Sequence, residues 1–390
     1  MMFFEIILAL AYAALLFIYQ CSWRSLPNPS LPKDYKPQTT ITVLIPARNE
    51  AENIGSCLRS VLEGNYPHNL LEIIVLDDFS EDRTAELVIK LPESFKLSGS
   101  SIAYIHLADH LLPKSQFTPN KKKAIEIGVF HAKGEIIVTT DADCLAQKDW
   151  LLFIAAAFEN PQTQMICGPV AFHQEKSLLQ RFQSLDFLGL MGITGAGVQL
   201  GWHHMANGAN LAFRKQVFET VNGYAGNAHL ASGDDMFLVQ KVAKRWPDSV
   251  SFLKNCNATV LTQASLDWRT FWHQRLRWGT KNAAIPSWPL RLSLLTVFLF
   301  CWSIWVNLAL AIAYAGMDIP ANFFCIFLFQ IIVKAVFDYF FLSEMCRFFK
   351  RKDLLRWFWP SFFMHTAYIV LIGTVSVFYK KYEWKGRSAT

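Results

Sequence analysis

The sequence predicts an α/β domain with a doubly wound, mostly parallel sheet, held between hydrophobic segments at both ends of the chain. Short strands rich in β-branched residues alternate with helical stretches over residues 40–140, which is the pattern of a parallel sheet. Apolar runs occupy residues 3–19 and the region beyond Trp288. The 390 residues are 52% hydrophobic and 17% charged, too apolar for an ordinary soluble enzyme.

The first hydrophobic segment predicts an N-terminal transmembrane helix over residues 1–22, in which Glu5 is the only charge of the apolar run. A cleavable signal peptide is the alternative, favoured by the small residues at 9–14. No positive region precedes the run, so an uncleaved anchor is the preferred interpretation. The Pro-rich residues 23–39 then predict an extended linker, followed by a domain over residues 40–285.

The C-terminal hydrophobic region, residues 286–380, predicts about three spans near 292–315, 321–342 and 360–379. Lys334 and Asp338 lie four residues apart inside the second span. They either pair with one another or mark a polar path, and pairing is preferred.

The charge pattern predicts a membrane partner. The net charge is +6, and basic residues gather near the ends of the apolar segments and in a basic tail over 381–390. This fits contact with anionic headgroups and a domain facing the cytosol, at the cytoplasmic (inner) membrane. Nucleic acid is disfavoured because no basic stripe with interleaved aromatic residues occurs in the domain. The eight cysteines lack metal-ligand spacing, as expected of reduced thiols.

Polar clusters follow three of the expected strands. The strands are at 40–46, 71–76, 102–106 and 135–140, with helices at 52–62, 84–90 and 121–131. Right-handed crossovers bring the carboxyl ends of parallel strands to one edge, where such sheets bind ligands. We therefore expect residues 48–50, 77–80 and 141–143 to share one crevice. Asp141 and Asp143 suit a divalent cation carrying phosphate oxygens, and a solvated acidic turn is the alternative.

The second half of the domain is less regular. An amphipathic helix is expected over 177–190, and the glycines at 192, 195, 197 and 201 indicate a loose stretch. Residues 207–210 form a small polar segment, and Gly233-Asp234-Asp235 opens a helix through 236–243. Residues 268–278 combine arginine with tryptophan and phenylalanine.

Taken together, these motifs resemble the family 2 glycosyltransferases with a GT-A fold. The resemblance covers residues 40–280 and is to the membrane-embedded branch that carries Q-x-x-R-W, here residues 274–278. That branch includes the cellulose, chitin, hyaluronan and poly-N-acetylglucosamine synthases and the ceramide glucosyltransferases. The resemblance is specific because five motifs occur together in the family's order along the chain: 43–50, Asp77-Asp78, the D-x-D at 141–143, Gly233-Asp234-Asp235 and Q-x-x-R-W.

The resemblance implies roles for the donor-side residues. Asp77 and Asp78 would hold the uracil end of a nucleotide sugar, near Pro46 and Glu50. Asp141 would face the ribose and diphosphate. The resemblance also implies that Asp143 ligates Mg²⁺ or Mn²⁺. Lys121 matches a lysine that reaches the donor, although Asn120 replaces the family's glycine; a solvated lysine run is the alternative.

The resemblance also implies the catalytic and acceptor-side residues. Asp235 would be the base that deprotonates an acceptor hydroxyl, giving inversion by a single displacement. Gln274 and Arg277 would line the donor cleft, with Arg277 on the diphosphate. Asn207, Asp234 and Trp278 would lie on the acceptor side.

Structural alternatives stand beside these roles. Asp77 could cap a turn and Asp235 could cap its own helix. Arg277 and Trp278 could be an interfacial membrane anchor. His203 and His204 could bind metal, although a plain acceptor-side loop is preferred.

The last residues raise a topological conflict. Glu383 to Arg387 resemble the W-[KR]-G-R tail of membrane glycosyltransferases, where the tail is expected in the cytosol. One span before the domain and three after it would place the tail outside. We therefore expect one of these segments to be interfacial or re-entrant.

The sequence thus predicts a metal-dependent, inverting glycosyltransferase that moves a sugar from a nucleotide sugar, preferably UDP-linked, to a membrane lipid or lipid-linked acceptor. A processive polysaccharide synthase, with a saccharide acceptor and a partner subunit, is the close alternative. A nucleotidyltransferase and a catalytically dead scaffold are more distant alternatives.

Overall fold

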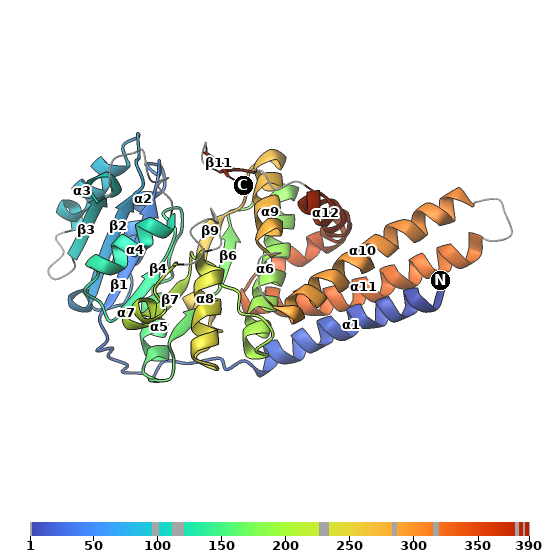
Figure 1. Cartoon of the computed structure of the whole chain (residues 1–390), viewed down its shortest axis with the longest axis horizontal. Helices are drawn as coiled ribbons and strands as arrows, with labels where there is room; N and C mark the ends of the chain where they lie inside the picture. The colour runs from blue at the N-terminus through green and yellow to red at the C-terminus, as the bar shows by residue number, and fades with distance from the viewer. Residues whose placement is uncertain are drawn as a thin grey trace. The chain divides into compact units, whose positions relative to one another are not determined.

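The computed structural model describes residues 2–95, 101–110, 121–225, 234–282, 287–314, 320–378, 382–384 and 387–389. The chain forms two compact units (Figure 1). The sheet unit contains residues 26–173 and 204–263, and the helical unit contains 1–25, 174–203 and 264–390. The division differs from the expected domain at 40–285, because residues 174–203 and 264–282 pack with the hydrophobic helices.

The sheet unit is built on a seven-stranded sheet of order β3-β2-β1-β4-β7-β5-β8. Its parallel half confirms the predicted α/β fold, since β1 pairs in parallel with β2 and β4, and β2 with β3. In the other half, β7 runs antiparallel to β4 and β5, while β5 and β8 are parallel. The strands are β1 (Ile41–Ala47), β2 (Leu71–Asp77), β3 (Ser101–His106), β4 (Ile136–Thr139), β5 (Met165–Cys167), β7 (Leu211–Arg214) and β8 (Val250–Phe252).

Helices and a second small sheet complete this unit. The strands β6 (Val170–His173) and β9 (Val260–Gln263) pair in parallel. The helices are α2 (Ile54–Leu62), α3 (Thr84–Phe95), α4 (Lys121–His131), α5 (Trp150–Phe158), α7 (Lys215–Thr220) and α8 (Asp234–Arg245), with short 3₁₀ turns η1 (His68–Leu70), η2 (Leu107–Asp109) and η3 (Cys256–Ala258).

The central strands are mostly apolar because both faces of the sheet are covered, and Glu72 within β2 accepts a hydrogen bond from the Thr42 hydroxyl of β1 at 2.7 Å. Every residue of β2 and β4 is buried. At the start of β4 the backbone of Gly134 approaches β1 closely, and a Cβ there would lie 2.4 Å from the Thr42 nitrogen. Glycine is therefore required where β4 enters the sheet beside β1.

The helical unit contains four helices that are long and apolar enough to cross a membrane, judged by length and composition. They are α1 (Met2–Ser25), α10 (Trp288–Ala313), α11 (Pro320–Phe348) and α12 (Phe358–Phe378), the last preceded by η4 (Lys352–Trp357). α1, α10 and α11 pack against one another around Leu8, Tyr12 and Phe300. Figure 1 shows these three running together, whereas α12 is seen almost end-on and packs on α6 (Leu178–Gln199) and α9 (Trp268–Asn282).

The expectation of a loose stretch around residues 192–197 is wrong, because α6 continues through it to Gln199. The helix begins at a capping box formed by Ser177 and Gln180. Its glycines allow close packing: a Cβ on Gly192 would lie 2.3 Å from the Met345 sulfur of α11. This contact offsets the poor helix propensity of glycine. The unit ends in a hairpin of β10 (Tyr382–Trp384) and β11 (Arg387–Ala389).

Candidate active site

The carboxyl ends of β1 and β2 and the segments after them are joined by hydrogen bonds, as the sequence predicts. The Asp78 N–H donates to the Ala47 carbonyl at 2.8 Å. The Asn49 N–H donates to the Ser80 hydroxyl at 3.0 Å, and the Glu81 N–H donates to the Asn49 Oδ1 at 2.8 Å. Asn49 adopts a positive φ of 52°, which asparagine tolerates better than most residues. The two polar segments therefore form one rim of the site.

The Asp77 carboxylate is held by hydrogen bonds within the protein, which bears on the role expected of the Asp77-Asp78 pair. The Asp77 carboxylate is 1% exposed and accepts hydrogen bonds from the Ser80 N–H at 3.2 Å, the Ser80 hydroxyl and the Tyr104 hydroxyl at 2.8 Å. Both of its oxygens are thus used within the protein, which favours the turn-capping alternative. The predicted contact of this pair with the nucleotide base is better assigned to Asp78, which follows it at the rim.

The other donor-side residues of this rim are placed as follows. Pro46 lies in β1 opposite Leu76 of β2 and is half-buried. Glu50 is 8% exposed, and its carboxylate accepts a hydrogen bond from the Asn53 amide at 2.9 Å. Their roles toward a nucleotide remain predictions.

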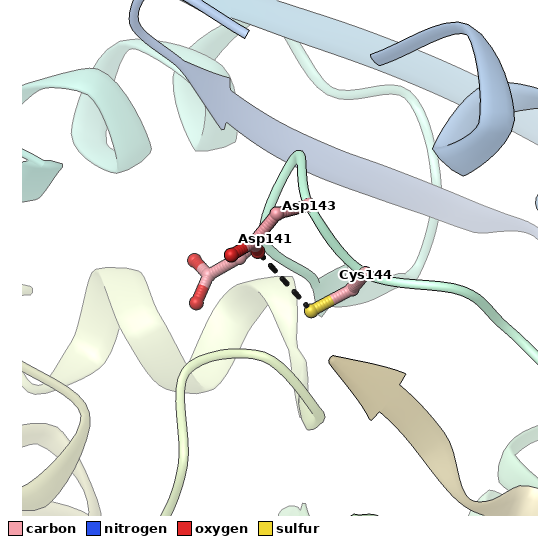
Figure 2. Close-up of side chains that lie close together, drawn as sticks. All are labelled: Asp141, Asp143 and Cys144. Carbon is pink, nitrogen blue, oxygen red and sulfur yellow. Dashed lines mark hydrogen bonds between the residues drawn. The ribbon is translucent and has the colours of Figure 1, made fainter. Parts of the chain in front are cut away.

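Two carboxylates and a thiol meet just after β4. Ligand atoms of Asp141, Asp143 and Cys144 lie within 4.8 Å of one another (Figure 2). The Cys144 thiol is 3.6 Å from the Asp143 Oδ1 and donates to it. Burial, followed by the charges of Asp141 and Asp143, raises the pKa of Cys144 well above its usual value. The two carboxylates at this turn offer oxygen ligands, which suit Mg²⁺ or Mn²⁺.

Replacing Cys144 with serine tests this assignment of the donor set. Because the Cys144 thiol donates a hydrogen bond to Asp143, which a serine hydroxyl can also do, we expect Cys144→Ser to keep activity within about threefold of wild type. The preference between Mn²⁺ and Zn²⁺ should also be unchanged, measured by titrating each ion into metal-stripped protein. Loss of metal activation in this variant would show that sulfur is a ligand.

Lys121 and Asp235 converge on the same end of β4. Lys121, the first residue of α4, forms an ion pair with Asp141. The Gly208 N–H donates to the Asp235 Oδ2 at 2.9 Å, and the Thr139 hydroxyl of β4 donates to the Gly208 carbonyl at 2.7 Å. A Cβ at Gly208 would lie 3.2 Å from the Lys121 Nζ. Lys121 is thus tied to this edge of the sheet, and its role toward the donor remains a prediction.

Asp235 faces the site from the start of α8. Its Oδ1 accepts the Met236 N–H at 2.9 Å, so one oxygen supports the first turn of the helix while the other meets Gly208. Burial and the charge of Asp235 raise the pKa of Cys167 to about 12. Gly233 and the side chain of Asp234 lie outside the described residues, as does Asn120.

The loop that carries Gly208 is fixed by a residue that sequence reasoning did not single out. Asn210 is 1% exposed; its amide donates to the Pro169 and Ala258 carbonyls and its oxygen accepts from the Trp150 indole. The Asn207 side chain accepts the Ala209 N–H at 3.0 Å and shapes the turn. The Asn-Gly-Ala-Asn pattern is the sequence feature from which such a loop could have been predicted.

Gln274, Arg277 and Trp278 lie on α9 of the helical unit. Trp278 packs against Phe187 of α6 at 5.9 Å between ring centroids. Their roles toward donor and acceptor remain predictions. His203 hydrogen-bonds the Tyr19 hydroxyl at 2.9 Å, and burial lowers the pKa of His204. The structural tie of His203 favours the loop interpretation over a metal pair.

A mostly parallel α/β sheet with paired acids, a lysine and a further acid at one edge defines a transferase of activated, phosphate-linked substrates. The model of Glycosyl transferase family 2 matches residues 42–221, and the model of Glycosyl transferase family group 2 matches residues 136–375. The chain therefore belongs to the family 2 glycosyltransferases.

Characterised relatives agree with this family. The probable glycosyltransferase YdaM of Bacillus subtilis is 24% identical over 65% of this chain and 58% of its own length. The poly-beta-1,6-N-acetyl-D-glucosamine synthase of Staphylococcus aureus strain COL is 24% identical over 61% of this chain and 53% of its own. The chain thus spans somewhat over half the length of these relatives.

A solved structure shows the same fold over almost the whole chain. The mannosyltransferase PcManGT from Pyrobaculum calidifontis, in complex with GDP-Man and Mn²⁺, has a TM-score of 0.55 and 20% identity. The match covers 95% of this chain and 98% of that one. This likeness confirms the GT-A architecture with an N-terminal helix and C-terminal apolar helices.

Proposed function

We propose that the protein is a membrane-bound, metal-dependent, inverting glycosyltransferase that moves a sugar from a UDP-sugar to a membrane lipid or lipid-linked acceptor. The observation that carries the proposal is the convergence at the end of β4. Lys121 is paired with Asp141 there, and Asp235 is held beside them through Gly208. An acid positioned beside a diphosphate-binding edge is what a single displacement at an anomeric carbon requires.

Each of these residues has its own proposed role in sugar transfer. Asp143, with Asp141, would hold Mg²⁺ or Mn²⁺, which supplies Lewis-acid neutralisation of charge on the leaving diphosphate. Lys121 adds a positive charge next to Asp141. Asp235 takes the proton of the acceptor hydroxyl onto a carboxylate oxygen as that hydroxyl attacks. Because Asp235 also accepts backbone N–H groups, its orientation is set before substrate binds.

The relatives support this choice and its alternative. One structural neighbour binds GDP-Man and Mn²⁺, which supports nucleotide-sugar and metal use here. Relatives named poly-beta-1,6-N-acetyl-D-glucosamine synthase support the alternative of a polysaccharide synthase. The family assignment argues against the nucleotidyltransferase alternative.

The deciding experiment measures nucleoside diphosphate release by purified protein in detergent. A panel of UDP- and GDP-sugars is supplied with Mn²⁺ or EDTA, with and without a membrane lipid extract. Metal-dependent release with one donor, enhanced by lipid, supports the proposal. Release of pyrophosphate, or no release with any donor, contradicts it. Product length on a gel then separates the acceptors, because a ladder of oligomers would indicate the processive alternative.

We also propose a membrane topology that removes the conflict over the C-terminal tail. α10 and α11 pack as an antiparallel pair, so Phe348 at the end of α11 returns to the side where α10 begins at Trp288. α12 starts ten residues later, and β10 after it packs on α9, which ends at Asn282, just before α10. α12 therefore begins and ends on one side and lies along the membrane surface. The segment Lys352–Ser376, which contains most of α12, has the lowest mean hydropathy of the four candidate spans.

This topology predicts that the C-terminus faces the cytosol together with the sheet unit, at the cytoplasmic membrane. We expect a fluorescent protein fused after Thr390 to be bright and alkaline phosphatase fused there to be inactive. The control fusion, truncated after Met317 between α10 and α11, should show the reverse. An active phosphatase at Thr390 would mean that α12 crosses the bilayer.

A further inference from the structure

A chain of buried and half-buried charged and polar side chains runs through the helical unit, and no role proposed above uses it. Its members come from five helices: Arg275 of α9, Asp186 of α6, His365 and Tyr368 of α12, Lys334 and Asp338 of α11, and Tyr12 of α1. The sequence suggested only the Lys334–Asp338 pair, which the structure confirms.

The strongest link joins α6 to α9. The Arg275 Nη1 lies 2.5 Å from the Asp186 Oδ2, and their side chains are 2% and 4% exposed. The Tyr368 hydroxyl donates to Asp186 at 3.5 Å. Burial opposes the charge of Asp186 and raises its pKa, while Arg275 acts in the opposite direction. Two opposite charges this deeply buried stabilise one another, and removing either one leaves the other buried without a counter-charge.

Asp186 is also connected to the hydrophobic helices. The His365 Nε2 lies 3.8 Å from the Asp186 Oδ1, and the His365 Nδ1 lies 3.4 Å from the Lys334 Nζ. Lys334 is completely buried, pairs with Asp338 and donates to the Tyr12 hydroxyl at 3.2 Å. Two carboxylates and two cations therefore balance in formal charge across the cluster.

Arg275 also lies against aromatic rings, including that of Trp278 in the Q-x-x-R-W motif of its own helix. Its guanidinium carbon lies 4.6 Å from the Trp278 ring centroid and 5.1 Å from that of Phe271, with Tyr368 of α12 at 5.5 Å. A guanidinium held between aromatic faces fixes the rings as well as itself. Arg275 follows Gln274 in the motif, and no role was assigned to it above.

We propose that the Asp186–Arg275 ion pair, linked through His365 to Lys334, is the positioning device that holds α9 and thereby orients Trp278 for transfer. Asp186 and Arg275 are positioning residues and not catalytic residues. The proposal rests on the proposed function, because α9 carries Gln274, Arg277 and Trp278. It adds a reason why the hydrophobic helices are needed beyond anchoring: they supply the charge environment that keeps α9 in place.

The test compares Asp186→Asn, Arg275→Met, the double variant Asp186→Asn/Arg275→Met and Arg275→Lys, all in lipid nanodiscs. Hydrogen exchange over residues 268–282 reports the order of α9, and exchange in β2 reports folding of the sheet unit. Nucleoside diphosphate release gives kcat and the donor KM. Arg24→Gln, which breaks the ion pair of a 63% exposed side chain with Glu344, is the matched control.

Each single neutralisation should speed exchange in α9 and lower kcat by about tenfold or more, and it should raise the donor KM as well, because Gln274 and Arg277 lie on the same helix. The double variant should be closer to wild type than either single variant, since no unpaired charge remains buried. Arg275→Lys should fall between wild type and Arg275→Met, because lysine keeps the charge but not the stacking plane. Arg24→Gln should match wild type.

Two results would overturn the proposal: unchanged exchange and kcat in the single variants, or a double variant whose losses are the sum of the single losses. Absence of release by wild type with every donor would instead contradict the proposed function. In that case the exchange data still decide whether the ion pair orders α9.

Discussion

Asp235→Asn is expected to abolish sugar transfer while leaving nucleotide-sugar binding intact. The two Asp235 oxygens accept the Gly208 and Met236 N–H groups. The Asn side chain has one oxygen and therefore keeps only one of these two hydrogen bonds. It cannot take a proton from the acceptor hydroxyl. General base catalysis contributes about 10²–10⁴-fold, and we expect kcat to fall by that amount.

The measurement is nucleoside diphosphate release at saturating donor, with donor affinity measured by calorimetry on the same preparation. The matched control is Asp248→Asn: this exposed residue has a positive φ of 64°, a conformation that asparagine also accepts. The control should retain wild-type release. A kcat for Asp235→Asn within a few-fold of wild type would remove Asp235 from the role of base.

Asp143→Ala is expected to lower activity by about 100-fold or more, because it removes a ligand that holds charge-neutralising metal at the diphosphate. EDTA should have a similar effect on wild type, and Mn²⁺ should restore wild type but not the variant. The physical reason is the donor set, since the carboxylate oxygens at this turn come from Asp141 and Asp143.

A metal titration followed by activity checks this prediction, with Asp34→Ala in the exposed linker as the control. The control should be activated by the same Mn²⁺ concentration as wild type. If Asp143→Ala kept full activity, or if EDTA had no effect on wild type, metal dependence through this pair of acids would be refuted.

The parallel half of the sheet could be predicted from the sequence because its strands are buried on both faces. β1, β2 and β4 are mostly apolar, β2 and β4 lead into acids, and each strand lies within a residue or two of its expected position. The right-handed connection rule then places 48–50, 77–80 and 141–143 at one edge. The candidate donor side of the site followed from this local pattern.

The antiparallel strand β7 and the straight course of α6 could not be predicted in the same way. β7 has four residues and enters between β4 and β5, so its direction depends on partners that are distant in sequence. The glycines of α6 weaken a helix locally, and at Gly189 and Gly192 the close approach of α11 compensates for this. Local propensity is overruled by packing at both places.

The sequence by itself determined the fold class, the family and the acids that follow the strands, since these depend on residue type and spacing along one chain. Only the tertiary structure distinguished Asp77, whose carboxylate is used by the turn, from Asp78. Only the tertiary structure joined Asp186 to Arg275 and both to Lys334. The physical reason is that a buried charge is stable only beside its counter-charge, and that partner is set by packing between helices far apart in the sequence.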